Sequence, residues 1–214
     1  MGGAEWGFLA AMISLSILWT LAGAYLLGSI PFGVLITRAG GAGDVRSIGS
    51  GNIGATNVLR TGRKDLALLT LLADAAKGAI PVLVARWLFP ETPLPYIAGG
   101  AAFIGHLFPV WLGFKGGKGV ATFYGVLFAA AWPVGIVAAV AWLASFAVTR
   151  ISSLSALVAA LAAPVAAWLT GQVWACVGLV TIMALLIFVR HHENISRLLK
   201  GQEPRFGAKK DPAS

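Results

Sequence analysis

Six long apolar runs dominate this chain and decide what it can fold into. They cover residues 6–37, 66–85, 96–114, 120–148, 154–169 and 173–189. A backbone in hydrocarbon must satisfy its own hydrogen bonds, so only helices and closed barrels can cross a bilayer. Barrel strands would show segments of about 10 residues with alternating polarity, whereas unbroken runs are typical of helices. We therefore predict an all-α, polytopic membrane protein, with one domain over residues 1–214 and a flexible tail at 206–214.

The number of crossings depends on the run at 120–148, which has 29 residues and carries Pro133 near its middle. A normal span takes about 20 residues, so this run is long for one crossing and short for two. If it crosses twice, 14 Lys/Arg lie on one side of the membrane and only Arg86 lies on the other; if it crosses once, the split is 7 against 8. The positive-inside rule therefore favours seven transmembrane helices, with the N-terminus outside and the C-terminus in the cytoplasm.

The first run, 6–37, is too long for a straight crossing, because at about 1.5 Å per residue it exceeds the roughly 30 Å of hydrocarbon. We expect one tilted helix that bends near Pro31. Arg38 is the first basic residue, so the charged start of a secretory signal is missing and no cleavage is expected. The single cysteine, Cys176, excludes an intramolecular disulfide and a thiolate zinc cluster.

A net charge of +8 accompanies this asymmetry and makes the cytoplasmic face attractive to anionic lipids or substrates. Since the chain has no separate basic domain, we do not expect it to bind nucleic acid. The sequence leaves the oligomeric state open, and a monomer is compatible with it.

Glycine, hydroxyl, amide and arginine residues gather in the polar segment 44–60. Glycine lets main-chain N–H groups turn toward an anion, and the arginine fork matches phosphate oxygens. Its residues Gly49, Gly51 and Gly54 spell G-x-G-x-x-G, but a dinucleotide site needs a preceding strand, and a membrane segment stands there instead. This segment predicts a phosphate site of another kind.

A second polar segment, 113–119, reads Gly-Phe-Lys-Gly-Gly-Lys-Gly. It departs from a nucleotide P-loop, because Leu112 takes the first glycine position and Gly119 replaces the Ser/Thr after Lys118. Taken alone, it is equally compatible with a phosphate-binding loop and with a flexible basic turn.

The third polar segment, 190–200, follows the last apolar run. Helical spacing would bring Arg190, Asn194 and Arg197 to one face. His191 or His192 could accept a proton or anchor the helix at the interface.

Within the second apolar run, Asp74 and Lys77 are three residues apart, and the cost of charge in hydrocarbon predicts that they face the bundle interior. Their role could be structural or functional.

These blocks occur together and in order: Gly-Ser-Gly-Asn-Ile-Gly-Ala-Thr-Asn at 49–57, Asp74-x-x-Lys-Gly, Gly105-His-x-x-Pro, Gly-Phe-Lys-Gly-Gly-Lys-Gly-Val-Ala-Thr at 113–122 and Arg190-His-x-Glu-Asn. Over residues 22–206 the chain resembles the bacterial acyl-phosphate-dependent glycerol-3-phosphate acyltransferases, the PlsY family. Only His192 stands where other members can carry a different basic residue.

The resemblance implies a seven-span enzyme of the bacterial cytoplasmic membrane with its site on the cytoplasmic side. Acyl phosphate and sn-glycerol 3-phosphate would give lysophosphatidic acid and inorganic phosphate, the first acylation of phospholipid synthesis. It implies no metal and no cofactor. The residues it assigns to catalysis are Ser50, Arg60, Lys118, His191 and Asn194. Those it assigns to substrate binding are Ser47, Gly49, Gly51, Asn52, Thr56, Lys115, Gly116, Gly117 and Ser153.

The chemistry suits these residues, because phosphate already leaves readily from a mixed anhydride and the enzyme mainly has to hold two phosphorylated molecules together. The His-x-x-x-x-Asp motif of other glycerolipid acyltransferases is absent. Two general bases remain open, His191 and an oxygen of the acyl phosphate itself, and we favour the second. No Ser has an evident His and carboxylate beside it in the sequence, so we expect direct transfer without an acyl-enzyme.

Two other classes of protein compete with this interpretation. Buried charges and Gly/Pro-interrupted helices also describe a small anion transporter, although inverted repeats are not evident at the level of motif. A non-catalytic membrane scaffold would not need both glycine-rich loops.

Overall fold

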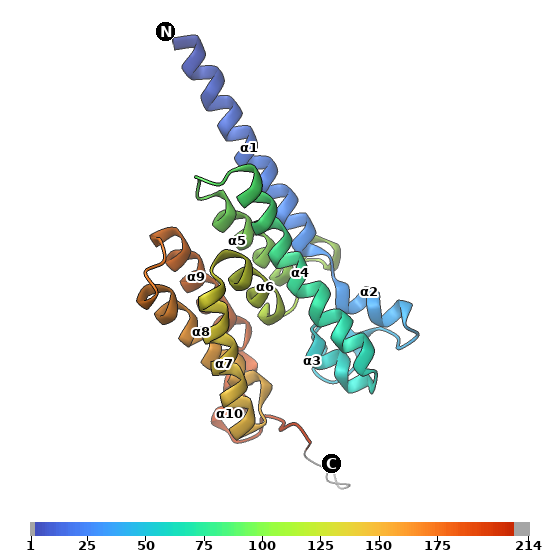
Figure 1. Cartoon of the computed structure of the whole chain (residues 1–214). Coiled ribbons are helices and arrows are strands. Elements are labelled where there is room, and N and C mark those ends of the chain that lie inside the picture. Colours follow the sequence, from blue (N-terminus) through green and yellow to red (C-terminus); the bar gives the residue numbers. More distant parts are fainter. Residues whose placement is uncertain (1–2, 208–214) are drawn as a thin grey trace.

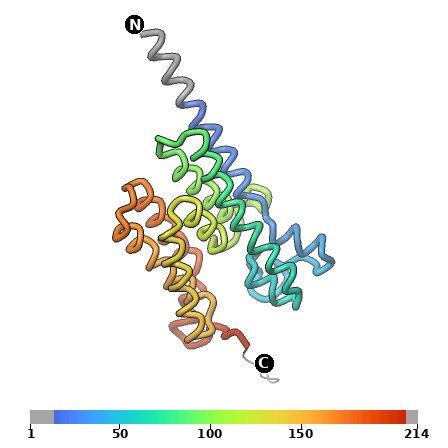
Figure 2. Tube along the Cα trace, in the orientation of Figure 1, coloured from blue at the N-terminus to red at the C-terminus, as the bar shows by residue number. Residues whose placement is uncertain are grey.

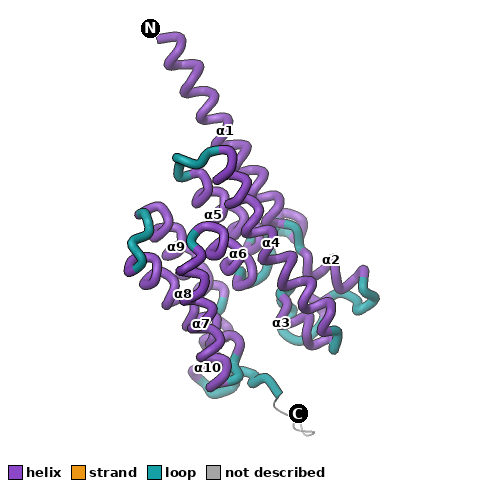
Figure 3. The backbone as a smooth tube through the Cα atoms, in the orientation of Figure 1, coloured by secondary structure: helices purple, strands orange, loops and turns teal. Residues whose placement is uncertain are grey.

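The computed structural model describes residues 3–207, and over that range the chain forms helices and loops without a strand (Figures 1 and 3). The long helices are α1 (Gly3–Ser29), α4 (Lys64–Leu88), α5 (Leu94–Leu107), α7 (Trp132–Thr149), α8 (Ser152–Leu169) and α9 (Trp174–Arg190). The shorter ones are α2 (Phe32–Ala39), α3 (Ala55–Val58), α6 (Val120–Ala130) and α10 (His192–Leu199), with 3-10 turns at Val45–Ser47, Leu59–Thr61 and Val110–Leu112. From residue 208 on, the expected tail lies outside the described residues.

Five helical segments of the described chain are long and apolar enough to cross a membrane. They are Ser14–Ala39, Lys64–Leu88, Leu94–Leu112, Trp132–Thr149 and Ser152–Leu169. Helix α9 becomes a sixth if it is taken together with α10, from which a bend of 61° separates it. Large apolar side chains such as Trp87, Leu143 and Leu185 point outward and are more than half exposed, as lipid-facing residues are. The all-helical, multi-span class is confirmed, while the count of seven stays a prediction.

The run at 120–148 is two helices, because α6 ends at Ala130 and α7 begins at Trp132. Pro133 lies in the first turn of α7, where its missing N–H costs nothing. Arg86 Nη2 donates to the Ala130 carbonyl at 2.8 Å and so satisfies a carbonyl at the end of α6. With 11 residues, α6 is about 17 Å long, roughly half of the hydrocarbon thickness.

The first apolar run also breaks where the sequence predicts a bend. Helix α1 ends at Ser29 and α2 begins at Phe32, on either side of Ile30 and Pro31. At the break, the Ile30 carbonyl accepts hydrogen bonds from the Phe32 N–H at 3.0 Å and from Lys77 Nζ at 2.8 Å. The bend is therefore a break between two helices, but together they still form one candidate span, Ser14–Ala39.

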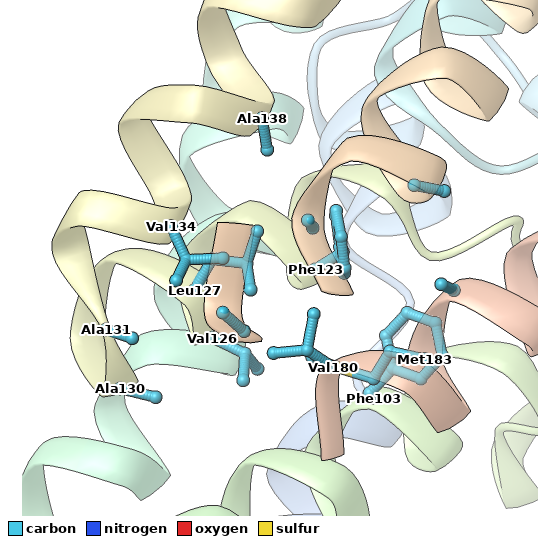
Figure 4. Packing of buried hydrophobic residues seen from close by; sticks show 14 of the residues in the cluster. Phe103, Phe123, Val126, Leu127, Ala130, Ala131, Val134, Ala138, Val180 and Met183 are labelled. Atoms are coloured by element: carbon cyan, nitrogen blue, oxygen red, sulfur yellow. The ribbon is translucent and has the colours of Figure 1, made fainter. Parts of the chain in front are cut away.

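Close packing of the helices depends on glycines that face a neighbouring backbone. A Cβ atom on Gly28 of α1 would lie 2.1 Å from the Ala102 carbonyl oxygen of α5, and one on Gly125 of α6 would lie 1.9 Å from the Ala75 carbonyl oxygen of α4. Small residues drive helix association in lipid in this way. Between the helices, Phe103, Phe123, Val126, Leu127 and Met183 fill the buried core (Figure 4).

The polar segments gather at one end of the bundle. The α2–α3 region, the turn between α7 and α8, and α10 all lie at the end opposite the N-terminus, whereas the α4–α5 loop lies at the other end (Figures 1 and 2). The basic segments around 38–64, 150 and 191–207 therefore share one end, as the charge asymmetry of the sequence requires.

Candidate active site

The glycine-rich segment after α2 is organised by the buried amide of Asn57. Its Nδ2 donates to three carbonyl oxygens, of Val45 at 2.9 Å, Ile48 at 2.9 Å and Asn52 at 2.8 Å. Its Oδ1 accepts from the Ser50 N–H at 3.2 Å and from Ser50 Oγ at 3.4 Å. One side chain thus holds the loop in shape and fixes Ser50 at its surface. The motif included Asn57, but nothing in its spacing distinguished this scaffolding amide from a substrate ligand.

The Arg60 side chain lies close to Ser50 because the residue before Ser50, Gly49, has no side chain. Gly49 has a left-handed backbone with φ 56°, and a Cβ there would lie 2.6 Å from Asn57 Oδ1 and 2.8 Å from Arg60 Nη1. The Arg60 side chain therefore crosses over Gly49 while remaining exposed. Gly51 is also left-handed, with φ 69°. The loop presents a hydroxyl and a guanidinium together, which is a suitable pair for a phosphate.

Other expected ligands in this segment make local contacts. Ser47 Oγ donates to the Asp44 carbonyl at 2.8 Å, so it closes a turn. Hydrogen bonds from Arg46, and a further one from Arg38, hold the pKa of the Asp44 carboxyl well below its usual range. Thr56 Oγ1 lies 3.4 Å from Ser152 Oγ at the start of α8, and this contact ties the glycine-rich segment to the other half of the bundle.

A second polar cluster forms around Glu203, which follows α10. Glu203 Oε1 accepts from Ser153 Oγ at 2.6 Å and from Asn194 Nδ2 at 2.5 Å, and its Oε2 accepts from Arg197 Nε at 2.7 Å. Lys118 Nζ donates to Asn194 Oδ1. The structure thus joins Lys118, Asn194 and Ser153, which the sequence could only name separately. Glu203 itself was missed; an acid within a basic tail was the only signal for it.

Two charged groups of this cluster, Lys118 and Glu203, have shifted pKa values. Burial lowers the pKa of the Lys118 ammonium, and the positive charge of Arg197 lowers it further. Burial raises the pKa of Glu203, but hydrogen bonds from Ser153, Asn194 and Arg197 outweigh it, so this pKa ends below its usual value. Glu203 therefore stays ionised at neutral pH. The cluster thus contains two cations, Lys118 and Arg197, and one anion, Glu203.

The third polar segment does not form the single helical face that its spacing predicts. The helix breaks at His191 and bends by 61° there, so Arg190 belongs to α9 while Asn194 and Arg197 belong to α10. Arg190 turns toward the second glycine-rich loop, where its Nη2 and Nε donate to the carbonyls of Gly116 and Gly117. Asn194 and Arg197 share one helical face as predicted, but Arg190 does not, because α9 and α10 point in different directions.

His191 lies buried at this break. Its Nδ1 is 2.8 Å from the Ile187 carbonyl oxygen, and a carbonyl can only accept, so Nδ1 carries a proton and Nε2 alone could take one up.

Lys115 is exposed in the loop before α6. Gly116 and Gly117 in the same loop use their N–H groups on the carbonyls of Leu107 and His106, so these two N–H groups are already committed within the fold.

Asp74 and Lys77 do face the bundle interior, as the sequence predicts. Lys77 Nζ is 2.7 Å from Asp74 Oδ1, and both side chains are almost completely buried. His106 of α5 joins them, with its Nδ1 3.7 Å from Asp74 Oδ1. Since Lys77 also holds the Ile30 carbonyl at the α1–α2 break, this cluster ties three helices together.

The site residues thus form two groups at the same end of the bundle. One contains Ser50, Gly49 and Arg60 on the loop that Asn57 shapes, and the other contains Lys118, Asn194 and Ser153 around Glu203. The hydroxyl pair of Thr56 and Ser152 bridges them. Fold and site together define an integral membrane protein that gathers arginine, lysine, amide and hydroxyl groups at one end of its helical bundle.

The chain belongs to the glycerol-3-phosphate acyltransferase family, whose model matches residues 18–201. It is 62% identical over 203 residues to the glycerol-3-phosphate acyltransferase of Caulobacter vibrioides (strain NA1000 / CB15N), covering 94% of this chain and 93% of that protein. It is 61% identical over 186 residues to the protein of the same name from Cereibacter sphaeroides (strain ATCC 17025 / ATH 2.4.3), covering 86% and 87%.

Two solved structures share the fold. The glycerol 3-phosphate form of PlsY (YgiH), an integral membrane glycerol 3-phosphate acyltransferase, matches with a TM-score of 0.86 at 41% identity, over 90% of this chain and 96% of that one. Its lysophosphatidic acid form matches with a TM-score of 0.84 at 40% identity over the same shares. The resemblance drawn from the motifs is therefore confirmed.

Proposed function

We propose that this protein transfers an acyl group from acyl phosphate to the 1-hydroxyl of sn-glycerol 3-phosphate, giving lysophosphatidic acid and inorganic phosphate. The names of its relatives support glycerol 3-phosphate as the acceptor, and the two forms of the PlsY structure match an acceptor and a product. The observation that carries the proposal is the contact between Lys118 and Asn194, together with the Thr56–Ser152 contact that joins their cluster to the loop that carries Ser50 and Arg60.

Two phosphorylated substrates repel each other, and this site offsets the repulsion. Lys118 and Arg60 supply positive charge, while Ser50, Ser153 and Asn194 supply neutral hydrogen-bonding groups. Phosphate is a good leaving group, so positioning and charge neutralisation account for most of the catalysis. We assign Lys115, Asn52 and Thr56 to substrate binding around this centre, with Gly49 and Gly51 shaping the loop that carries Ser50. Gly116 and Gly117 have their N–H and carbonyl groups engaged within the fold.

Transfer is direct. The glycerol oxygen forms a bond to the acyl carbonyl carbon, the bond from that carbon to the phosphate oxygen breaks, and the hydroxyl proton moves to an oxygen of the acyl phosphate. His191 is the alternative acceptor, through Nε2. Intact-protein mass after mixing with acyl phosphate alone tests the absence of an acyl-enzyme, and a stoichiometric adduct that later transfers to glycerol 3-phosphate would contradict it.

We place the site at the cytoplasmic face of the bacterial inner membrane, with the N-terminus outside and seven crossings, of which α6 is the short one. The positive-inside rule supports this orientation, since the polar end of the bundle carries the basic loops. Acyl transfer there would be the first acylation of phospholipid synthesis.

Phosphate release by the purified protein in detergent tests the proposal. With acyl phosphate and glycerol 3-phosphate we expect phosphate and lysophosphatidic acid in equal amounts, and no product with acyl-CoA or acyl carrier protein as the donor. Product formed from acyl-CoA would refute the choice of donor. If the protein in vesicles takes up phosphate or glycerol 3-phosphate without acylating anything, the competing anion transporter is correct instead.

A further inference from the structure

The main chain at Gly116 and Gly117 is enclosed by side chains from two helices. On one side lies His106 of α5: a Cβ on Gly117 would come within 2.2 Å of His106 Nε2, and one on Gly116 within 2.2 Å of the His106 carbonyl oxygen. The Gly117 N–H donates to that same carbonyl at 3.1 Å. Only glycine can approach His106 so closely, so these two residues rest directly on the buried end of α5.

Arg190 holds the same segment from the other side. Its Nη2 donates to the Gly116 carbonyl at 2.7 Å and its Nε donates to the Gly117 carbonyl at 3.1 Å. The guanidinium also lies 5.7 Å from the centre of the Phe108 ring. None of the ion pairs among the side chains of residues 14–207 involves Arg190. A planar fork suits two adjacent carbonyls, and a lysine ammonium cannot reproduce that geometry.

Lys118 follows this clamped segment at once. Gly119 then takes a left-handed backbone, with φ 85°, before α6 begins at Val120. The Lys118 backbone is therefore fixed on both sides, and its ammonium reaches Asn194 of α10. Arg190 is also the last residue of α9, directly before the break that leads to α10, the helix that carries Asn194. Arg190 therefore contacts the loop that carries Lys118 and lies next to the helix that carries its partner Asn194.

We propose that Arg190 is a positioning residue, which clamps the Gly116–Gly117 main chain against His106 and thereby places the Lys118 ammonium in the active site. The inference rests on the proposed function of that site. Arg190 touches main chain and not the reacting atoms, so its effect on the reaction passes through Lys118.

Three variants test the clamp, with activity expressed per folded protein. Arg190→Gln removes both the planar guanidinium and its charge, while Arg190→Lys removes the guanidinium but keeps a positive charge. Arg86→Gln is the matched control, since Arg86 also donates to a helix-end carbonyl, of Ala130, at the other end of the bundle. We expect kcat/KM to fall about 100-fold in both Arg190 variants, the usual scale for a catalytic group displaced by about 1 Å, and to stay near wild type in Arg86→Gln.

The alkaline limb of the pH profile separates positioning from simple loss of folded protein. Burial is the main cause of the lowered pKa of Lys118, and the charge of Arg190 adds to it. Both variants displace the Lys118 ammonium from its buried position, so both should move the limb of kcat/KM to higher pH, and Arg190→Gln should move it further because it also removes a positive charge. A destabilised but otherwise normal site would lose amplitude without moving the limb.

Two results would overturn the inference: Arg190→Gln with the kcat/KM of Arg86→Gln, or a limb that does not move in Arg190→Gln. Lys118→Ala distinguishes this failure from failure of the proposed function. If Lys118→Ala is inactive and Arg190→Gln is normal, only the positioning role is wrong. If Lys118→Ala is fully active, the site assignment fails, and the role of Arg190 fails with it.

Discussion

Replacing Asn57 should damage the active site without removing any group that touches substrate. In Asn57→Ala the carbonyls of Val45, Ile48 and Asn52 lose their donor and the Ser50 N–H loses its acceptor. The amide shares two hydrogens among three carbonyls, so at about 1 kcal/mol net for each full hydrogen bond the loss could reach about 3 kcal/mol. Val45 is fully buried, but Ile48 and Asn52 are only partly so, and water can replace their bonds. We therefore expect a loss of about 2 kcal/mol in the free energy of unfolding.

The kinetic effect should be larger than the effect on stability suggests, because Ser50 loses its fixed position beside Arg60. We expect kcat/KM to fall about 10- to 100-fold, measured as phosphate release at equal amounts of folded protein. Asn57→Asp is the matched variant, since it keeps the oxygen that accepts from Ser50 but cannot donate to the three carbonyls. It also adds negative charge where an anion should bind, so it should be at least as impaired. Wild-type kcat/KM and melting temperature in Asn57→Ala would refute the reasoning.

Three further predictions concern charge and topology. Lys118→Ala and Arg60→Ala should each lower kcat/KM by about 100-fold or more, on the scale of lost electrostatic stabilisation, whereas Arg150→Gly, which suits the left-handed backbone at that position (φ 57°), should remain active. The pKa of Lys118 is lowered by burial, so kcat/KM should decline with rising pH below the usual lysine value of about 10.4, and Lys118→Arg should move this decline upward. In a background without the native cysteine, a cysteine at Gly201 should react with an impermeant thiol reagent only after the membrane is opened, and one at Thr92 should react from outside; external labelling at 201 would exclude seven crossings.

Membrane insertion, helix content and family could be read from the sequence because each depends on local chemistry. Transfer of an apolar run into lipid depends on the run itself, so the helices appear where hydrophobicity predicts them. Pro31 and Pro133 marked both breaks, since a proline lacks the N–H that a helix interior needs. The residue types of the motif at 49–57 favoured an anion-binding loop, and that assignment stays a prediction.

Only the tertiary structure decided which polar groups cooperate. Glu203 is 50 residues from Ser153, and Lys118 is 76 residues from Asn194, and helical periodicity relates no residues at such separations. Helical spacing even misled for Arg190, because the break at His191 turned it away from Asn194 and toward Gly116 and Gly117. Asn57 stood in the sequence motif without an assigned role, and only the fold showed that its amide binds the carbonyls of its own loop. Hydrophobic runs fix each helix independently, whereas a polar network exists only after the helices have packed, which is why the sequence determined the bundle and the fold determined the site.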